Sequence, residues 1–155
     1  MADAAVSLAF SPEGRHLAAN SASHWNGDEW QGTLACFDVG TGQLVWANGI
    51  ENGFHVDLPL PEDFANGFFA EVVWSPDGKR LFLGSAAGAL IVFDAASGET
   101  PGILQTSTLL PLEELAIDER QGVVWAFGQK AGLRSAGLNM VPEPVEVEEE
   151  EEQDE

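Results

Sequence analysis

Short apolar runs, each closed by a turn signal, follow one another along most of the chain. The runs lie at residues 6–10, 16–19, 33–37, 44–46, 72–74, 80–84 and 89–93. Clusters of Ser, Pro, Asp, Asn and Gly stand between them, and these are the residue types that make tight turns. Short runs rich in Val, Leu, Ile, Phe and Trp between such clusters predict β-strands.

The same order of runs and turns occurs more than once. The run FSPEG at residues 10–14 returns as WSPDG at residues 74–78. The run FDVGTG at residues 37–42 returns as FDAASG at residues 93–98, and a weaker third copy covers residues 115–127. The chain is therefore predicted to contain about three copies of one structural unit.

Glycines close the turns of the two better copies. Proline presets φ at the second turn position, and glycine supplies the positive φ that lets the chain enter the next strand. The predicted structural turn residues are Gly14, Gly42, Gly78 and Gly98.

The repeated unit has the composition of a propeller blade. Four short antiparallel strands, here named a to d in chain order, in a unit of about 40–45 residues are typical of such a blade. The FSPEG and WSPDG turns, each followed by FD and then TG or SG, resemble the repeats of WD-repeat propellers. Residues 38–46, in the pattern DxxTGxxxW, also resemble the blades of quinoprotein propellers. The resemblance covers residues 5–135 and implies a β-propeller.

The repeats depart from the WD pattern where that pattern forms its hydrogen-bonded tetrad. The Gly-His pair before strand a is missing, and Ala87 takes the place of the Asp in the b–c turn. Phe37 and Phe93 take the place of the Trp before the Asp, so we expect no such tetrad. In the second copy, Gly102 also takes the place of the quinoprotein Trp.

These observations predict an all-β fold: a partial β-propeller of about three four-stranded antiparallel blades with a disordered acidic C-terminal tail. The propeller covers residues 1–140, with blades at about residues 5–50, 68–106 and 109–138, and the tail covers residues 141–155. Closed propellers usually have four to eight blades. We therefore expect a homo-oligomer, or pairing with another propeller chain, to complete the ring.

Two long connections place candidate binding residues on one side of the blades. Ser11 and Ser75 are 64 residues apart while Phe37 and Phe93 are 56 apart, so the first b–c connection is the longer one. Neighbouring strands run antiparallel, so b–c and d–a connections leave the blades on the same side, which we call the insertion face. Its candidate binding residues are His24, Trp25, Asp28, Glu29, Trp30, Phe54, His55, Asp57 and Phe64.

The insertion face has two interpretations. Enlarged loops on a rigid scaffold commonly bind partners, and an acidic and aromatic surface suits a basic or amphipathic protein segment. Alternatively, Trp25, Trp30 and Phe64 fold back and cap the end of the blade, since exposed aromatic patches are costly.

The net negative charge of the chain excludes some classes of binding partner. The net charge is −20, from 26 acidic and 6 basic residues, which argues against nucleic acid and anionic membranes. Nine of the acidic residues lie in residues 141–155, which read either as a solubilising tail or as a segment that binds a basic partner. The sequence shows no signal peptide and no apolar run long enough to span a membrane, so we expect a cytoplasmic protein.

Residues able to do chemistry are few. Cys36 is the only cysteine and is expected in the core. The histidines and acids of the insertion face lack the spacing of metal sites, so we expect no metal and no cofactor. The sequence therefore predicts a non-catalytic protein-interaction scaffold. Two alternatives stay open: a fragment or subunit of a quinoprotein or lactonase-like propeller enzyme, and a remnant of a longer propeller gene.

Overall fold

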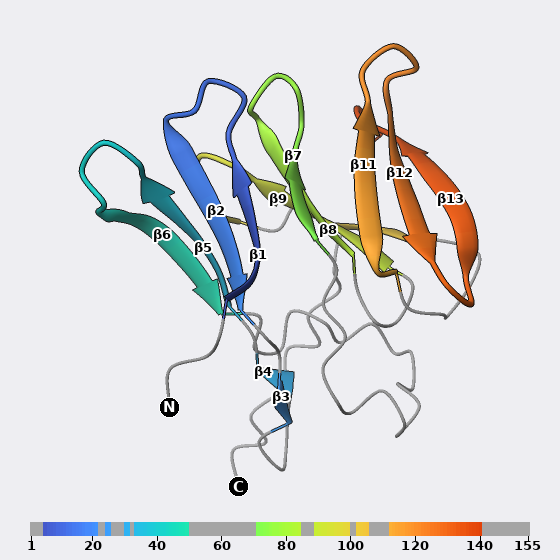
Figure 1. The fold of residues 1–155 in the computed structure, drawn as a ribbon, viewed down its shortest axis with the longest axis horizontal. Helices are drawn as coiled ribbons and strands as arrows, with labels where there is room; N and C mark the ends of the chain where they lie inside the picture. The colour runs from blue at the N-terminus through green and yellow to red at the C-terminus, as the bar shows by residue number, and fades with distance from the viewer. Residues whose placement is uncertain are drawn as a thin grey trace, which may run out of the picture.

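Three antiparallel sheets that stand side by side make up the body of the protein (Figure 1). The computed structural model describes residues 5–21, 24–25, 30–31, 33–49, 71–84, 89–99, 102–105 and 112–140. Each run that the sequence predicted as a strand lies in a strand of these sheets. The predicted all-β class with antiparallel blades is confirmed. None of the described segments is a helix long and apolar enough to span a membrane.

The first sheet, blade 1, has the strand order β1-β2-β5-β6. Its strands are β1 (Ala5–Phe10), β2 (His16–Ser21), β5 (Thr33–Asp38) and β6 (Leu44–Gly49). Neighbouring strands are also neighbours in the repeat, so they correspond to strands a to d of one blade. The connection between β2 and β5 carries a separate two-stranded pair, described below.

The second sheet, blade 2, repeats this order with β7 (Val72–Trp74), β8 (Arg80–Gly84), β9 (Ala89–Asp94) and β10 (Gly102–Gln105). The third sheet, blade 3, consists of β11 (Glu114–Asp118), β12 (Val123–Gly128) and β13 (Gly132–Gly137). The prediction gave the third blade four strands, and the described residues supply three. Residues 141–155, predicted as a disordered tail, lie outside the described residues.

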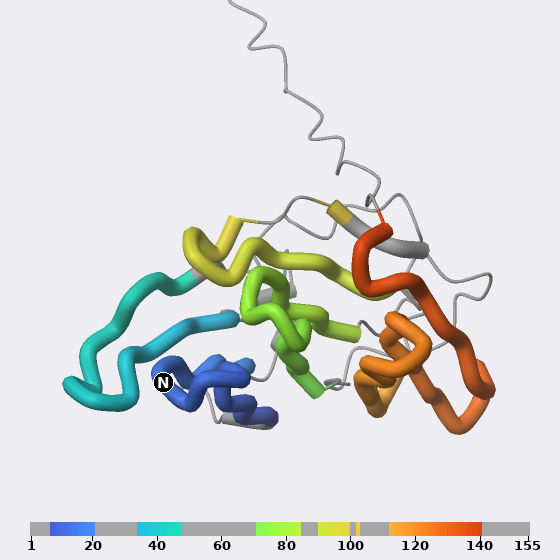
Figure 2. Tube along the Cα trace, turned by 90° about the horizontal axis from the view of Figure 1, so that it is seen from above, coloured from blue at the N-terminus to red at the C-terminus, as the bar shows by residue number. Residues whose placement is uncertain are grey.

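The first strands of the three blades lie along one side of the molecule. Strand β7 contacts β1 on one side and β11 on the other. Seen from above, the blades fan outward from this side, with blade 2 between blades 1 and 3 (Figure 2). The three sheets are therefore arranged as neighbouring sectors of a ring.

The repeated turns have the same hydrogen bonds in blades 1 and 2. The Ser11 hydroxyl accepts a hydrogen bond from the His16 amide at 3.0 Å, and the Ser75 hydroxyl accepts one from the Arg80 amide at 2.9 Å. These turns need a left-handed residue before the next strand. The four glycines assigned to the turns have φ values of 71° (Gly14), 70° (Gly42), 72° (Gly78) and 75° (Gly98).

Aspartates organise the turns that join strands c and d. The Asp38 carboxylate accepts hydrogen bonds from the Thr41 amide at 2.9 Å and the Thr41 hydroxyl at 3.0 Å. The Asp94 carboxylate accepts the equivalent bonds from the amide of Ser97 at 2.9 Å and its hydroxyl at 3.0 Å. Hydrogen bonds to the charged form stabilise it, so these donors hold the pKa of both carboxyls below the ordinary value.

The substitution Asp94→Asn should flatten the acid dependence of stability. The pKa of Asp94 is lowered in the folded state by the Ser97 and Ala96 donors. The folded state therefore binds fewer protons than the unfolded state, and the contribution of Asp94 is lost as the pH falls below ~4. Unfolding measured from about pH 5 to about pH 2 should show the wild type losing more stability than Asp94→Asn. Parallel pH profiles would rule out this role.

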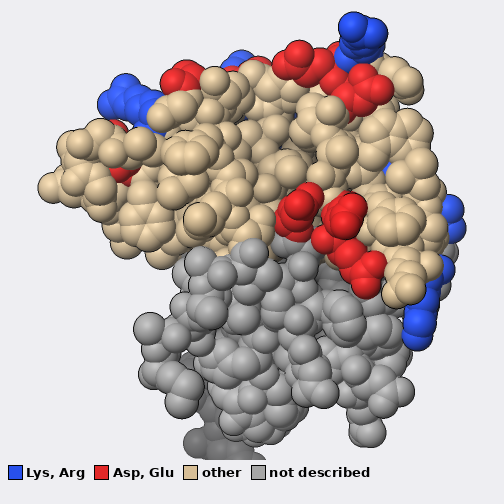
Figure 3. Space-filling view, viewed as in Figure 1, with Lys and Arg blue, Asp and Glu red and all other residues tan. Residues whose placement is uncertain are grey.

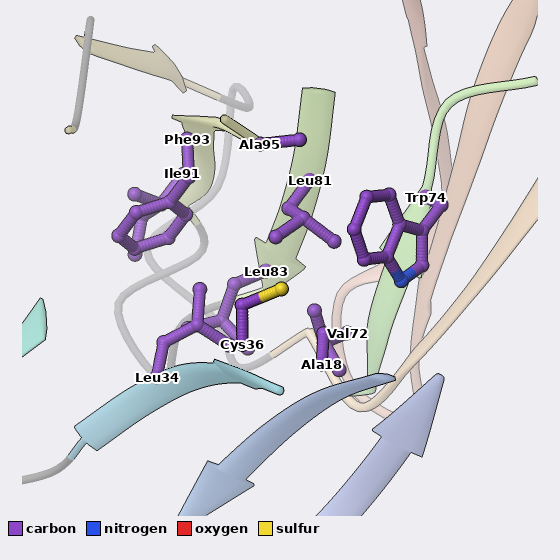
Figure 4. Close-up of a cluster of buried hydrophobic side chains, with 10 residues drawn as sticks. All are labelled: Ala18, Leu34, Cys36, Val72, Trp74, Leu81, Leu83, Ile91, Phe93 and Ala95. Carbon is purple, nitrogen blue, oxygen red and sulfur yellow. The ribbon is translucent and has the colours of Figure 1, made fainter. Parts of the chain in front are cut away.

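The core fills the two spaces between the blades. Successive side chains along a strand point to opposite faces of the sheet, so blade 2 contributes side chains to both spaces and buries both of its faces. We call the face of a blade toward the preceding blade its first face, and the face toward the following blade its second face. The first face of blade 2 packs on the second face of blade 1 (Figure 4), with a core made of Ala18, Leu34, Cys36, Val72, Trp74, Leu81, Leu83, Ile91, Phe93 and Ala95.

The second core lies between blades 2 and 3. It consists of Phe82, Leu90, Val92, Leu112, Leu115, Val124, Ala126, Ala131 and Leu138. Cys36, expected in the core, is buried in the first of the two spaces, and burial raises the pKa of its thiol. That prediction is confirmed.

Candidate functional site

Blade 2 is tied to blade 1 by hydrogen bonds that involve aromatic and first-strand residues. The indole Nε1–H of Trp74 donates to the carbonyl of Ala9 at 2.9 Å. The Val72 amide donates to the Ser7 hydroxyl at 3.1 Å, and the His16 ring stacks on Trp74 with the ring centroids 6.4 Å apart. The first face of blade 2 is thus held by packing and by directional bonds together.

Blade 3 is tied to blade 2 by one hydrogen bond equivalent to those above and by the side chain of Arg80. The Leu115 amide donates to the Glu71 carboxylate at 3.3 Å. Glu71 lies 64 residues after Ser7 and occupies the same position in the repeat. Each of these two side chains accepts a hydrogen bond from a backbone amide in the first strand of the following blade. Arg80 donates to the carbonyls of Leu138 at 3.2 Å and Met140 at 2.8 Å. One mode of blade-to-blade contact therefore occurs twice in this chain.

A second tie between blades 1 and 2 comes from strand β6. The indole Nε1–H of Trp46 donates to the carbonyl of Ala95 at 2.9 Å, and its ring lies over Gly98 in the turn that follows β9. A Cβ built on Gly98 would clash with carbon atoms of this ring. Gly102 takes the place of Trp46 in the second copy, so this residue cannot make the corresponding contact from blade 2.

The first face of blade 1 lies open. Leu8 and Phe10 of β1 are 60% and 63% exposed, whereas their repeat counterparts Val72 and Trp74 are 2% and 8% exposed. Phe10 pairs with Leu17, and Leu17 pairs with Phe37, so the apolar row continues across the blade. Apart from its upper rim, the surface over blade 1 is mostly uncharged in Figure 3.

The second face of blade 3 lies open in the same way. The paired residues of the two blades can be aligned. One row across blade 2 consists of Trp74, Leu81 and Phe93, and the equivalent row across blade 3 consists of Ile117, Val124 and Ala136.

This alignment makes Leu133 the counterpart of Leu90. Leu90 is 2% exposed on the covered second face of blade 2, and Leu133 is 57% exposed. Phe127, paired with Leu133, is 43% exposed. Both end blades therefore present, uncovered, the faces that blade 2 buries.

The insertion between β2 and β5 forms a small hairpin. Strands β3 (His24–Trp25) and β4 (Trp30–Gln31) pair antiparallel, with Trp25 opposite Trp30 and His24 opposite Gln31. They form a sheet separate from blade 1 and stand below it in Figure 1. Of the predicted insertion-face residues, the structure places the backbone of His24, Trp25 and Trp30. The others, Asp28, Glu29, Phe54, His55, Asp57 and Phe64, lie outside the described residues.

No protein-family model and no curated protein matches the sequence. Solved structures do match its fold. The structure of U3-55K superposes with a TM-score of 0.67 at 12% identity, over 94% of this chain and 39% of that chain. The RRP9 WD40 repeats superpose with a TM-score of 0.65 at 13% identity, over 94% of this chain and 38% of that chain. The chain has the fold of part of a WD-repeat propeller.

A third WD-repeat-like match comes from the structure of the Mitotic Checkpoint Complex, with a TM-score of 0.59 at 14% identity. It covers 90% of this chain and 36% of that chain. The chain thus spans about two fifths of the length of the WD-repeat chains that it matches. The resemblance predicted from the FSPEG, WSPDG and FDxx[TS]G motifs is confirmed.

Within this WD-repeat fold, the open faces of the two end blades are the candidate site; the blade count predicted that the ring needs completion, but the motifs did not single out the residues on these faces. Leu8, Phe10, Phe127 and Leu133 have no motif of their own, and Phe10 and Trp74 look equivalent in the repeat. The sequence indicates these faces in one way: the first and third copies keep apolar residues at the positions that face a neighbouring blade. Among the described residues, no three His, Cys, Asp or Glu side chains are grouped as metal ligands.

Proposed function

We propose that this chain is a non-catalytic protein-interaction scaffold of the WD-repeat type, whose open blade faces are covered by the blades of another chain. The observation that carries the proposal is the contrast between equivalent residues. Phe10 is 63% exposed where Trp74 is 8% exposed, although both occupy the same repeat position. Apolar faces of this kind gain free energy when another surface removes them from water.

The fold comparisons support the same class of function. One of the similar structures consists of WD40 repeats, and another is part of the Mitotic Checkpoint Complex. Both the scaffold and a propeller-enzyme subunit require further blades to close a ring, and the propeller enzyme also requires ligands gathered around its centre. The scaffold needs no such ligands, so we prefer it, and a cytoplasmic location remains part of this proposal.

A thiol-labelling experiment tests the scaffold proposal. Native Cys36 is buried and its thiol pKa is raised, so it contributes little background labelling. In Leu8→Cys the new thiol reports on the open face of blade 1, and Ala96→Cys, on an exposed turn of blade 2 away from both open faces, serves as the control. In an extract of the source cells, labelling of Leu8→Cys should be about tenfold slower than in dilute protein at low salt, where the chains are separate, while labelling of Ala96→Cys is unchanged. Equal labelling of Leu8→Cys in the extract and in dilute protein at low salt would contradict the proposal.

The insertion face is a second candidate binding surface. Its support is the β3–β4 hairpin, which is separate from the blade 1 sheet and pairs Trp25 with Trp30. The double substitution Trp25→Ala and Trp30→Ala should weaken binding of a basic amphipathic peptide at least tenfold by calorimetry, because aromatic anchors dominate such interfaces. The circular dichroism spectrum should not change. Loss of the fold in the double variant would favour the interpretation that these residues cap the blade.

A further inference from the structure

Both contacts between blades that the described residues form have the same polarity. The second face of blade 1 packs on the first face of blade 2, and the second face of blade 2 packs on the first face of blade 3. The two open faces are the first face of blade 1 and the second face of blade 3. They are therefore the two unlike halves of one further contact of the kind that the chain already makes twice.

We infer that the second face of blade 3 packs on the first face of blade 1 of a second copy, and that two copies close into one ring. This inference rests on the proposed function and names its partner. A head-to-tail contact between unlike surfaces closes when a twofold axis relates the copies, because each copy then supplies both surfaces once. Two copies supply about six blades, which lies within the range of closed propellers.

The exposed side chains match this assignment. Blade 1 offers Leu8 and Phe10 on its first strand, and blade 3 offers Phe127 and Leu133 on β12 and β13. In the covered contacts of the same chain, the counterparts Val72, Trp74 and Leu90 are each less than a tenth exposed. The unlike faces are thus built from the positions that the repeat uses for burial, and a second copy places them opposite each other.

Val39 extends the apolar area of blade 1 beyond the strands. It is 46% exposed, and its counterpart Ala95 is 7% exposed in the core between blades 1 and 2. Leu44 and Val45, at the bulge opposite Phe37, are also exposed. The apolar area thus continues from the first strand of blade 1 to the turn that joins its strands c and d, and a partner of the size of a blade would cover it.

Charge sets the conditions under which the copies associate. Each copy carries a net charge of −20, so two copies repel one another at low ionic strength. At 0.1 M salt, charges that lie more than a Debye length of about 10 Å apart are largely screened from one another. Association of two copies is therefore expected to tighten as salt is added.

Paired charge variants test the polarity of the contact. Phe10→Lys blocks the open face of blade 1, and Leu133→Glu blocks the open face of blade 3. Both side chains are more than half exposed, so each variant chain keeps its own core. Ala96→Lys and Ala96→Glu, on an exposed turn of blade 2, are the matched controls because they add the same charges away from both open faces.

The readout is the solution mass by multi-angle light scattering. The wild type and both controls should show twice the chain mass of 16.5 kDa. Phe10→Lys alone and Leu133→Glu alone should show the single-chain mass. Their equimolar mixture should return to the doubled mass, because one contact is then native and the other joins opposite charges.

Other results overturn the inference in distinguishable ways. If either variant alone keeps the doubled mass, the copies do not join head to tail, and the scaffold proposal stands. If the wild type keeps the single-chain mass at all concentrations and salts, a second copy is not the occupant. In that case, protection of Leu8→Cys in cell extract assigns the face to another chain, and its absence overturns the scaffold proposal as well.

Discussion

The substitution Gly98→Ala should lower the free energy of unfolding by about 3–4 kcal/mol. Alanine at a φ of 75° is strained by about 1–2 kcal/mol. The new Cβ would also displace the Trp46 ring, which lies over Gly98 and donates to the carbonyl of Ala95. Displacing a half-buried indole and its hydrogen bond adds about 2 kcal/mol. Chemical unfolding in dilute protein measures the effect.

Gly42→Ala is the matched control for this prediction. Gly42 has a φ of 70° in the equivalent turn of blade 1, and nothing lies within 4 Å of a Cβ built on it. It should therefore cost only the strain, about 1–2 kcal/mol. In a Trp46→Ala background, Gly98→Ala should fall to this same value, because the ring is gone. Equal costs for Gly42→Ala and Gly98→Ala in the wild type would show that the Trp46 ring does not hold blade 2.

The substitution Trp74→Ala should cost about 3–5 kcal/mol, the usual range for truncating a large buried aromatic side chain. Trp74 is packed between blades 1 and 2, and its indole donates to the carbonyl of Ala9 at 2.9 Å. Trp74→Phe should recover most of the packing and lose only the hydrogen bond, about 1 kcal/mol. Thermal or urea unfolding of the three proteins gives the comparison.

The matched control for Trp74 is its repeat counterpart. Phe10→Ala should cost less than about 1 kcal/mol in dilute protein, because Phe10 is 63% exposed there. Its cost should rise with protein concentration as a second copy covers the face, since stability is linked to association. A cost for Phe10→Ala in dilute protein as large as that of Trp74→Ala would mean that the two faces are equally covered within one chain.

The parts of the fold that depend on local chemistry could be predicted from the sequence. Pro12 and Gly14 define one turn, and the Asp38-to-Gly42 segment defines another, because turn geometry depends on only four or five residues. Because these turns recur in the second copy, the strands between them and the order of the strands within each blade could be predicted. The β3–β4 hairpin was not predicted as strands, since its strands are two residues each and show no alternation.

The parts that depend on contacts between blades could not be read in the same way. Trp46 and Ala95 are 49 residues apart, and their hydrogen bond depends on how blades 1 and 2 are set against each other. Phe10 and Trp74 occupy one repeat position, so the pattern alone does not separate an open face from a covered one. The third blade was predicted with four strands because the first two have four, whereas its described residues form three.

Solution mass measured by light scattering across a series of protein and salt concentrations tests the central claim most directly. The account predicts a species of twice the chain mass of 16.5 kDa that becomes more populated as protein concentration and salt rise. A cooperatively folded protein with the mass of a single chain at every protein and salt concentration would contradict the claim that two copies cover each other's open blade faces.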